Sequence, residues 1–184
     1  MTLALMRGAD LIGRPVVDAS TGERLAEIKD VVFDARLGTI TGLTLRNPGL
    51  LGRRLNDVLP IGAVVSVGTD AVIVEGDEAL TPGDEAPANM AAAKSDDVLD
   101  VQVITESGRK LGALRDVIIL GGPAPRIVGF EVGGGPVGNG LVPLGAQAAV
   151  SGNALIVPDE YEQRIREDLT GLAAELSLMD SGFV

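Results

Sequence analysis

Two aspartates, Asp30 and Asp116, are the residues whose spacing first suggests chemistry. Each precedes a run of aliphatic residues, and each follows a glycine at the same distance, Gly22 in one case and Gly108 in the other. A symmetric pair of carboxylates can share a proton or hold a divalent metal ion. The aliphatic context is typical of strands, so the alternative is a separate hydrogen bond made locally by each aspartate. We favour this alternative and expect no metal site here.

A glycine-rich stretch, Gly133–Gly138, contains the spacing G-x-G-x-x-G and follows the apolar run IVGFEV. A dinucleotide loop of this kind needs a helix directly after it, because the helix N-terminus faces the pyrophosphate. Asn139 to Pro143 follow instead, and a sequence containing Gly140 and ending in proline does not provide that helix. We therefore interpret the stretch as a connection between strands and expect no cofactor.

The chain contains neither cysteine nor histidine. This composition removes disulfides, thiol nucleophiles, imidazole bases and the usual zinc ligands. Carboxylates, lysine or serine could still serve an enzyme that has a suitable pocket, and an enzyme remains the third of three hypotheses. The prediction is that the chain has no catalytic residues and is not an enzyme.

The net charge of −11 is unevenly distributed. Residues 77–97 carry one basic and six acidic side chains, and residues 159–184 carry two basic and seven acidic ones, so the rest is nearly neutral. A nucleic-acid-binding face needs clustered Lys and Arg. Arg53 and Arg54 form one of only two adjacent basic pairs, which argues against nucleic acid as a partner.

The first apolar run is only a few residues long and ends before Arg7. This run is too short for the core of a signal peptide or for a membrane span, and no later run reaches the length of a span. We expect a soluble, cytoplasmic protein without a membrane span.

The chain is organised around a repeat, because residues 18–45 return in degraded form as residues 105–132. The turn glycines, the leucines three residues after them and the Asp-Val pairs match at a constant offset of 86, and residues 60–74 match residues 143–157 at an offset of 83. Short β-branched and aliphatic runs between turn residues predict strands. About six such strands per copy are typical of a small closed barrel. Aromatic residues make up only 2% of the chain, so the core must be aliphatic.

This organisation predicts four parts. Residues 1–76 form a first small barrel and residues 98–158 a second one. Residues 77–97 form an acidic linker, within which a short helix over 88–94 is possible. Residues 159–184 form an amphipathic helix and a tail. The predicted fold class is all-β with a C-terminal helix, built from two small β-barrels in tandem.

The predicted C-terminal helix begins at Asp159, since Asp159 and Glu162 have the spacing of a capping box. Apolar side chains then recur at helical intervals and form a face that needs a partner surface. This face consists of Tyr161, Ile165, Leu169, Leu172 and Leu176. Two interpretations stay open, packing on the protein's own barrel and pairing of two chains in a homodimer.

The repeated pattern resembles the PRC-barrel family. The residues that carry the resemblance follow the order G-x-x-L-(A/G)-x-(I/L)-x-D-V, and they are Gly22, Leu25, Ala26, Ile28, Asp30 and Val31, then Gly108, Leu111, Gly112, Leu114, Asp116 and Val117. The family includes the cytoplasmic domain of the photosynthetic reaction centre H subunit and the C-terminal domain of a ribosome maturation factor. The resemblance implies small β-barrels that bind partner proteins or RNA–protein assemblies, with no shared catalytic residues.

These observations lead to one functional expectation, a non-catalytic protein-interaction module whose partner is unidentified. Contact is expected through the loops Asn47–Val58, which holds Arg53 and Arg54, and Gly133–Gly140, or along the C-terminal helix. The alternative, by family analogy alone, is an RNA- or ribosome-associated maturation factor. The nearly neutral barrels argue against that alternative.

Overall fold

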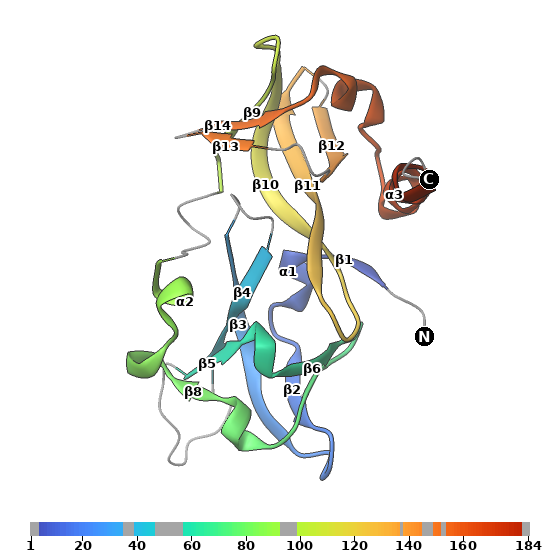
Figure 1. Ribbon diagram of the computed structural model, residues 1–184. Coiled ribbons are helices and arrows are strands. Elements are labelled where there is room, and N and C mark those ends of the chain that lie inside the picture. The colour runs from blue at the N-terminus through green and yellow to red at the C-terminus, as the bar shows by residue number, and fades with distance from the viewer. Residues whose placement is uncertain are drawn as a thin grey trace. The chain divides into compact units, whose positions relative to one another are not determined.

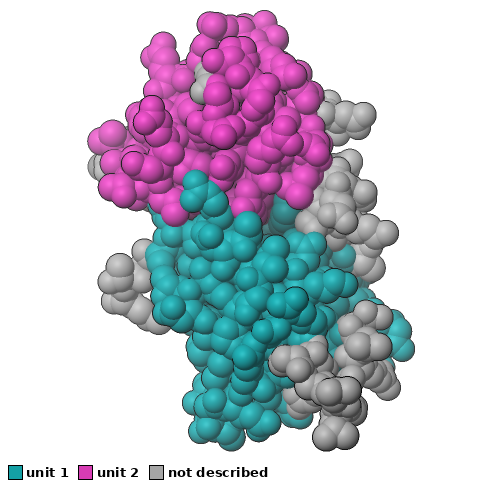
Figure 2. Space-filling view, turned by 180° about the vertical axis from the view of Figure 1, so that it is seen from behind, with its two compact units in different colours: residues 1–97, 120–126 teal, residues 98–119, 127–184 magenta. Residues whose placement is uncertain are grey.

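The computed structural model describes most of the chain. The described residues are 4–34, 39–46, 57–92, 99–136, 138–144, 149–151 and 154–181. Their contacts divide the chain into two compact units, which Figure 2 shows in different colours. Unit 1 comprises Met1–Asp97 together with Leu120–Arg126, and unit 2 comprises Val98–Ile119 together with Ile127–Val184.

Unit 1 is built on a sheet with the strand order β6-β7-β2-β3-β4-β5-β8 (Figure 1). A short strand and a single helical turn, β1 (Leu5–Arg7) and α1 (Gly8–Leu11), precede it. The sheet strands are β2 (Pro15–Asp18), β3 (Arg24–Asp34), β4 (Thr39–Arg46), β5 (Asp57–Pro60), β6 (Val64–Val67), β7 (Val72–Val74) and β8 (Thr81–Pro82). Neighbouring strands are antiparallel except β2 and β7, which are parallel. The parallel pair joins the start of the copy to its end.

Unit 2 repeats this plan with the order β12-β11-β10-β9-β14-β13. Its strands are β9 (Gln102–Thr105), β10 (Lys110–Leu120), β11 (Arg126–Gly135), β12 (Gly138–Pro143), β13 (Ala149–Ser151) and β14 (Ala154–Val157). Strands β9 and β14 form the parallel pair. The predicted all-β architecture in two copies is therefore confirmed.

The strand registers show how closely the copies correspond. Val16 lies opposite Val72 in the first parallel pair, and Val103 lies opposite Leu155 in the second. Val16 and Val103, before the first hairpin turn, are 87 positions apart, whereas Gly22 and Gly108, in that turn, are 86 apart. The first hairpin turn is thus one residue longer than the second.

Residues 120–126, which connect β10 to β11, belong to unit 1. The Val67 N–H donates to the Gly122 carbonyl at 3.0 Å, and the Gly122 N–H donates back to Val67 at 2.8 Å. The Gly121 N–H also donates to the carbonyl of Ala4 at 2.9 Å. These bonds satisfy backbone groups at the edge strand β6, which would otherwise be a template for further pairing.

Both cores are aliphatic, as the composition predicts. The largest fully buried side chains are Leu11, Ile28, Leu43 and Leu59 in unit 1, and Leu111, Leu114, Ile118, Ile119, Phe130, Leu141, Leu155 and Leu172 in unit 2. Phe130 is the one aromatic residue among them. The burial patterns of β3 and β10 agree at all but one position, so the same positions of the two copies lie inside.

Each unit ends in a segment that folds back onto its own sheet, here called the closing segment. In unit 1 this is residues 77–92, which form a 3₁₀ turn at Asp77–Ala79, β8, a second 3₁₀ turn at Gly83–Glu85, and α2 at Ala88–Ala92. In unit 2 it is residues 159–181, which form a 3₁₀ turn at Asp159–Arg164 and, after an extended stretch, α3 at Leu169–Ser181.

The two closing segments meet their sheets at equivalent points. Thr81 pairs with Val58 on β5, and Arg166 pairs with Leu141 on β12. Val58 and Leu141 are the same position in the two copies, since each lies two residues before the proline that faces Gly42 or Gly129. Part of the range 77–97 suggested as a linker, residues 77–92, is therefore folded into unit 1. Residues 93–98 lie outside the described residues.

The C-terminal helix is present, but its predicted start at Asp159 is wrong. The α-helix begins at Leu169 and is capped by Asp168, whose carboxylate accepts a hydrogen bond from the Gly171 N–H at 2.7 Å. This is the geometry of an aspartate N-cap. Residues 159–164 form a 3₁₀ turn instead, so Tyr161 lies outside the α-helix. No helix in the described part of the chain has the length and apolar character needed to cross a membrane.

Candidate functional site

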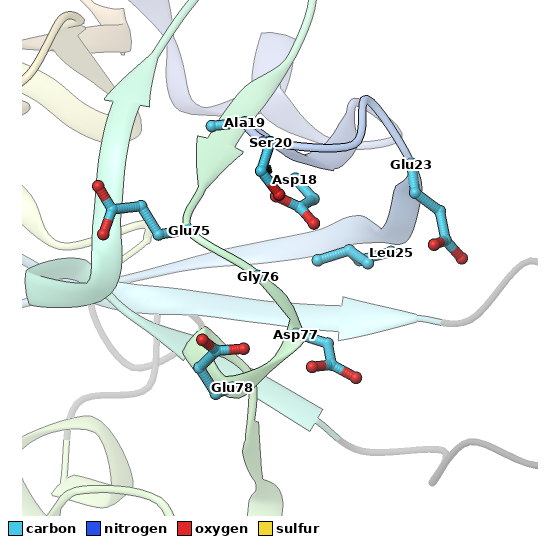
Figure 3. Close-up of a pocket in the computed structure, with 9 residues that line it drawn as sticks. All are labelled: Asp18, Ala19, Ser20, Glu23, Leu25, Glu75, Gly76, Asp77 and Glu78. Carbon is cyan, nitrogen blue, oxygen red and sulfur yellow. Dashed lines mark hydrogen bonds between the residues drawn. The ribbon is translucent and has the colours of Figure 1, made fainter.

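An open cavity of about 700 Å³ lies in unit 1, beside the turn between β2 and β3 (Figure 3). Two segments line it, the turn itself and the residues that follow β7. The lining residues are Asp18, Ala19, Ser20, Glu23, Leu25, Glu75, Gly76, Asp77 and Glu78. The parallel pairing of β2 with β7 brings these segments together, because Asp18 lies opposite Val74 at the end of that ladder. Five of the nine residues carry carboxylates and none carries a positive charge.

Asp18 is the buried carboxylate of this cavity, with a relative exposure of 8%. It accepts hydrogen bonds from the Ser20 N–H at 2.8 Å, the Ser20 hydroxyl at 2.9 Å and the Thr21 hydroxyl at 2.9 Å. Gly22 completes the turn with a positive φ of 72°, a conformation that glycine adopts without strain. The Ser20 N–H and hydroxyl, followed by the Thr21 hydroxyl, hold the pKa of Asp18 below its ordinary value. Asp18 is therefore ionised at neutral pH.

The cavity is suited to positively charged groups. Leu25 contributes apolar surface between the two acidic segments, so a Lys or Arg side chain could place its alkyl stem there and its charge among the carboxylates. Within the described residues, no group of three or more acidic side chains has the geometry to hold a metal ion.

The equivalent place in unit 2 contains an arginine that pairs with one of its acidic side chains. Arg109 corresponds to Glu23, since their carbonyls accept the equivalent hydrogen bonds from Thr105 and Asp18. The Arg109 guanidinium forms an ion pair with Glu162 at 2.9 Å. The first copy has a glutamate at the position where the second has an arginine. The same framework thus presents opposite charges at this turn.

The turn carboxylate also comes from a different strand in unit 2. Thr105 takes the position of Asp18, and Asp159, beyond the end of β14, supplies the carboxylate. Asp159 accepts a hydrogen bond from the Ser107 N–H at 2.9 Å. Hydrogen bonds from the Ser107 side chain and N–H, and then from Thr105, lower the pKa of Asp159.

Asp30 and Asp116 each make a local hydrogen bond in their own copy. The Asp30 carboxylate accepts from the Val31 N–H at 2.8 Å, and the Asp116 carboxylate accepts from the Val117 N–H at 2.7 Å. These bonds agree with the favoured interpretation, in which each aspartate makes a separate local hydrogen bond. Gly22 and Gly108 likewise occupy matching turns with positive φ.

The glycine-rich stretch forms part of a hairpin between β11 and β12, and β12 follows where a dinucleotide loop would need a helix. Gly135 is required by close packing, because a Cβ atom there would lie 2.0 Å from the Leu111 carbonyl oxygen. Gly134 and Gly138 both have a φ of 71°. These glycines serve the strand geometry.

The apolar residues predicted to bind a partner divide into two groups. Tyr161 and Leu172 are buried within unit 2, with exposures of 3% and 0%. Ile165, Leu169 and Leu176 are half-buried. The buried pair agrees with the interpretation in which the segment packs on its own barrel, and a role in pairing chains stays a prediction for the other three. Arg53, Arg54 and most of the loop Asn47–Val58 lie outside the described residues.

Sequence reasoning did not find the acidic cavity. Asp18 lies at the start of the repeat and residues 77 and 78 at the start of an acidic stretch, and they come close together only through the parallel pairing of β2 and β7. The sequence signal for the cavity is a difference between the copies at this turn, where Arg109 of the second copy corresponds to Glu23 of the first.

Comparison with known proteins agrees with this architecture. The model of the PRC-barrel domain matches the chain twice, over residues 4–80 and 90–164. The chain belongs to the PRC-barrel family and contains two tandem copies of its domain. A search of curated proteins found no match.

Proposed function

We propose that this protein is a non-catalytic interaction module that binds a partner protein through a basic segment, received by the acidic cavity of unit 1. The observation that supports this proposal is the charge difference between equivalent places in the two copies. In unit 2, Arg109 forms an ion pair with Glu162 at this turn, whereas unit 1 has Glu23 at the position of Arg109. A partner's guanidinium or ammonium group would complete unit 1 in the way that Arg109 completes unit 2.

The electrostatics of the cavity favour such a partner. Asp18 stays ionised at neutral pH because its hydrogen bonds lower its pKa. The remaining acids line an open surface. Clustered charges of one sign steer an oppositely charged partner and raise its association rate more than its final affinity. Binding should therefore weaken as the salt concentration rises, because exposed charges are screened.

The test is affinity purification from a native lysate with a charge-reversed double variant, Glu23→Arg with Glu78→Arg. We expect the wild-type chain to capture a reproducible partner and the variant to lose it. The matched control reverses two exposed acids of unit 2, Glu106→Arg with Glu167→Arg, and should retain the partner. Nuclease treatment of the lysate distinguishes a protein partner from an RNA-bridged one. Equal capture by both double variants, or no reproducible partner at all, would contradict the proposal.

A further inference from the structure

The closing segment of unit 2 shows how this framework binds a helix. Leu172 on α3 is fully buried and lies against Gly129, where a Cβ atom would come within 3.2 Å of the leucine Cδ2. Before the helix, Arg166 is extended and exchanges two backbone hydrogen bonds with Leu141, at 2.7 and 2.9 Å. The segment thus binds in two steps along the chain. An extended residue pairs with the edge strand, and a leucine of the following helix then packs against a glycine of the sheet, here called the glycine floor.

Unit 1 contains the same receptor surface, here called the Gly42 socket. Gly42 occupies the position of Gly129, and Val58 that of Leu141. The occupant of the socket is Met90, which packs with Val32 and Val58 and is 5% exposed. A Cβ atom at Gly42 would lie 2.4 Å from the Met90 Cε. The two sockets match in position, in their glycine floor and in their apolar occupant.

The occupant of the Gly42 socket is held less firmly than that of unit 2. Its helix α2 has five residues, and such a short helix has little stability of its own. The strand that precedes it, β8, has two residues, and Pro82 has no N–H to donate. Met90 is the one fully buried side chain among the described side chains of that closing segment. Methionine is also flexible enough to leave and refill an apolar site.

A carboxylate beside the Gly42 socket favours a positive charge on any segment that takes the place of the closing segment. Asp57 stands where unit 2 has Gly140, and Gly140 is the residue that the Ile165 side chain covers. A basic residue in place of Ile165 would lie beside the Asp57 carboxylate. The acidic cavity begins the same closing segment, since Glu78 precedes Thr81 by three residues. Both features are complementary to a basic segment.

We propose that Met90 is a built-in occupant of a docking site, and that an amphipathic helix of the partner protein, preceded by a basic extended stretch, displaces it from the Gly42 socket. The partner segment replaces Thr81 as the residue that pairs with Val58, places a Lys or Arg beside Asp57, and inserts a leucine over Gly42. This inference rests on the proposed function and specifies the form of its partner.

The test uses a labelled synthetic peptide with the sequence of residues 163–181 and the change Ile165→Lys. Its fluorescence anisotropy is measured with the full-length chain. We expect Met90→Ala to bind the peptide about tenfold more tightly than wild type, because the competing occupant is removed. Met6→Ala, a truncation at another buried methionine of unit 1, should leave the affinity unchanged. Asp57→Asn should remove the preference for the Lys peptide over the unmodified one.

Hydrogen exchange of the wild-type chain gives a second measurement that needs no variant. Excess peptide should expose the Met90 amide, which donates to the Pro87 carbonyl at 2.9 Å, while the amide of Val58 stays protected. Unchanged peptide affinity in a folded Met90→Ala chain, or an unchanged exchange rate of the Met90 amide, would contradict the proposal that a partner displaces Met90.

The outcomes separate the two proposals. If the unmodified peptide binds as well as the Lys peptide, the occupant is the closing segment of a second copy, and the basic partner is wrong. If Met90→Ala leaves the peptide affinity unchanged while charge reversal at Glu23 and Glu78 still abolishes capture of the partner, the docking site at Gly42 is wrong and the proposed function is kept. If the peptide occupies the socket while the charge-reversed chain keeps every partner, the acidic cavity fails instead.

Discussion

The closing segments of the two units return to the same place on the same framework but are held differently. In unit 2, α3 has 13 residues, and its Glu175 is buried between Arg166 and Arg164. In unit 1, α2 has five residues and follows a strand of two. The barrel therefore determines where a closing segment binds, whereas the segment's own length and contacts determine how firmly it binds.

The largest expected effect comes from removing the two occupants. Leu172→Ala should lower the free energy of unfolding of unit 2 by about 2–5 kcal/mol, since a fully buried leucine is replaced by a cavity. Met90→Ala should cost unit 1 about 2 kcal/mol, at the low end of that range, because its segment adapts more easily. Tyr161 is the one tyrosine of the chain and is buried in unit 2, so its fluorescence reports unit 2 unfolding. Circular dichroism follows both units.

Equal losses of stability from Leu172→Ala and Met90→Ala would contradict this difference between the units, since unit 1 would then be as firmly closed as unit 2. Leu172→Met is the control for size, and it should cost under about 1.5 kcal/mol because the volume is nearly conserved.

The next effect concerns the glycine floors. Alanine at Gly42 would place its Cβ 2.6 Å from the Leu59 carbonyl oxygen, and alanine at Gly129 would place it 2.8 Å from that of Val142. Both carbonyls belong to strands and cannot move far, so each substitution should destabilise its unit by about 1–3 kcal/mol. Combining Gly42→Ala with Met90→Ala relieves the methionine contact but leaves the Leu59 contact. Denaturant unfolding gives the stability of the single and double variants. A double variant as stable as Met90→Ala alone would show that the contact with the Leu59 carbonyl costs nothing.

The fold could be predicted from sequence to the extent that it depends on local signals. Turn glycines such as Gly22 and Gly108, and aliphatic alternation between them, mark the strands, and the matching positions reveal two copies. The short helix expected over 88–94 is present as α2 (Ala88–Ala92). These features depend on backbone conformation and side-chain type, which the sequence shows directly.

The features that were missed depend on contacts between distant residues. The capping signal at Asp159 predicts a helix, but that carboxylate is used by the Ser107 N–H across the sheet, and Asp168 caps the helix instead. The closing segments share no visible pattern, because only one buried side chain, Met90 or Leu172, has to match. The acidic cavity forms only when β7 returns beside β2. The cap, the closing segments and the acidic cavity all depend on the parallel strand pair or on a closing segment that folds back onto its sheet.

The two turn carboxylates give a pH test of the comparison. Asp18 and Asp159 both have folded-state pKa values below the ordinary 3.8. Their contribution is therefore complete above that value and is lost as the pH falls through the lowered folded-state pKa. We expect Asp159→Asn to destabilise unit 2 at neutral pH and to make little difference at a pH well below 3.8, where the wild-type carboxyl is protonated too. Tyr161 fluorescence in denaturant at the two pH values measures this.

Asp18→Asn is the matched variant in unit 1, followed by circular dichroism. It should show the same pH dependence although its carboxylate comes from the other strand. A difference between Asp159→Asn and wild type that persists unchanged at low pH would contradict the assignment, because an uncharged effect would then be responsible.

The smallest expected effect is at Asp100, which has a φ of 69° where the first copy has Gly13 with a φ of 84°. Both N–H groups donate at 2.8 Å to equivalent carbonyls, those of Leu114 and Ile28. A left-handed conformation costs a non-glycine residue about 1–2 kcal/mol, while glycine loses about 0.5–1 kcal/mol through its greater freedom when unfolded. Asp100→Gly should therefore change the stability of unit 2, followed by Tyr161 fluorescence, by less than about 1 kcal/mol. A larger loss would mean that the exposed ion pair of Asp100 with Arg115 contributes more than such pairs usually do, and the two copies would then differ at this turn in energy as well as in sequence.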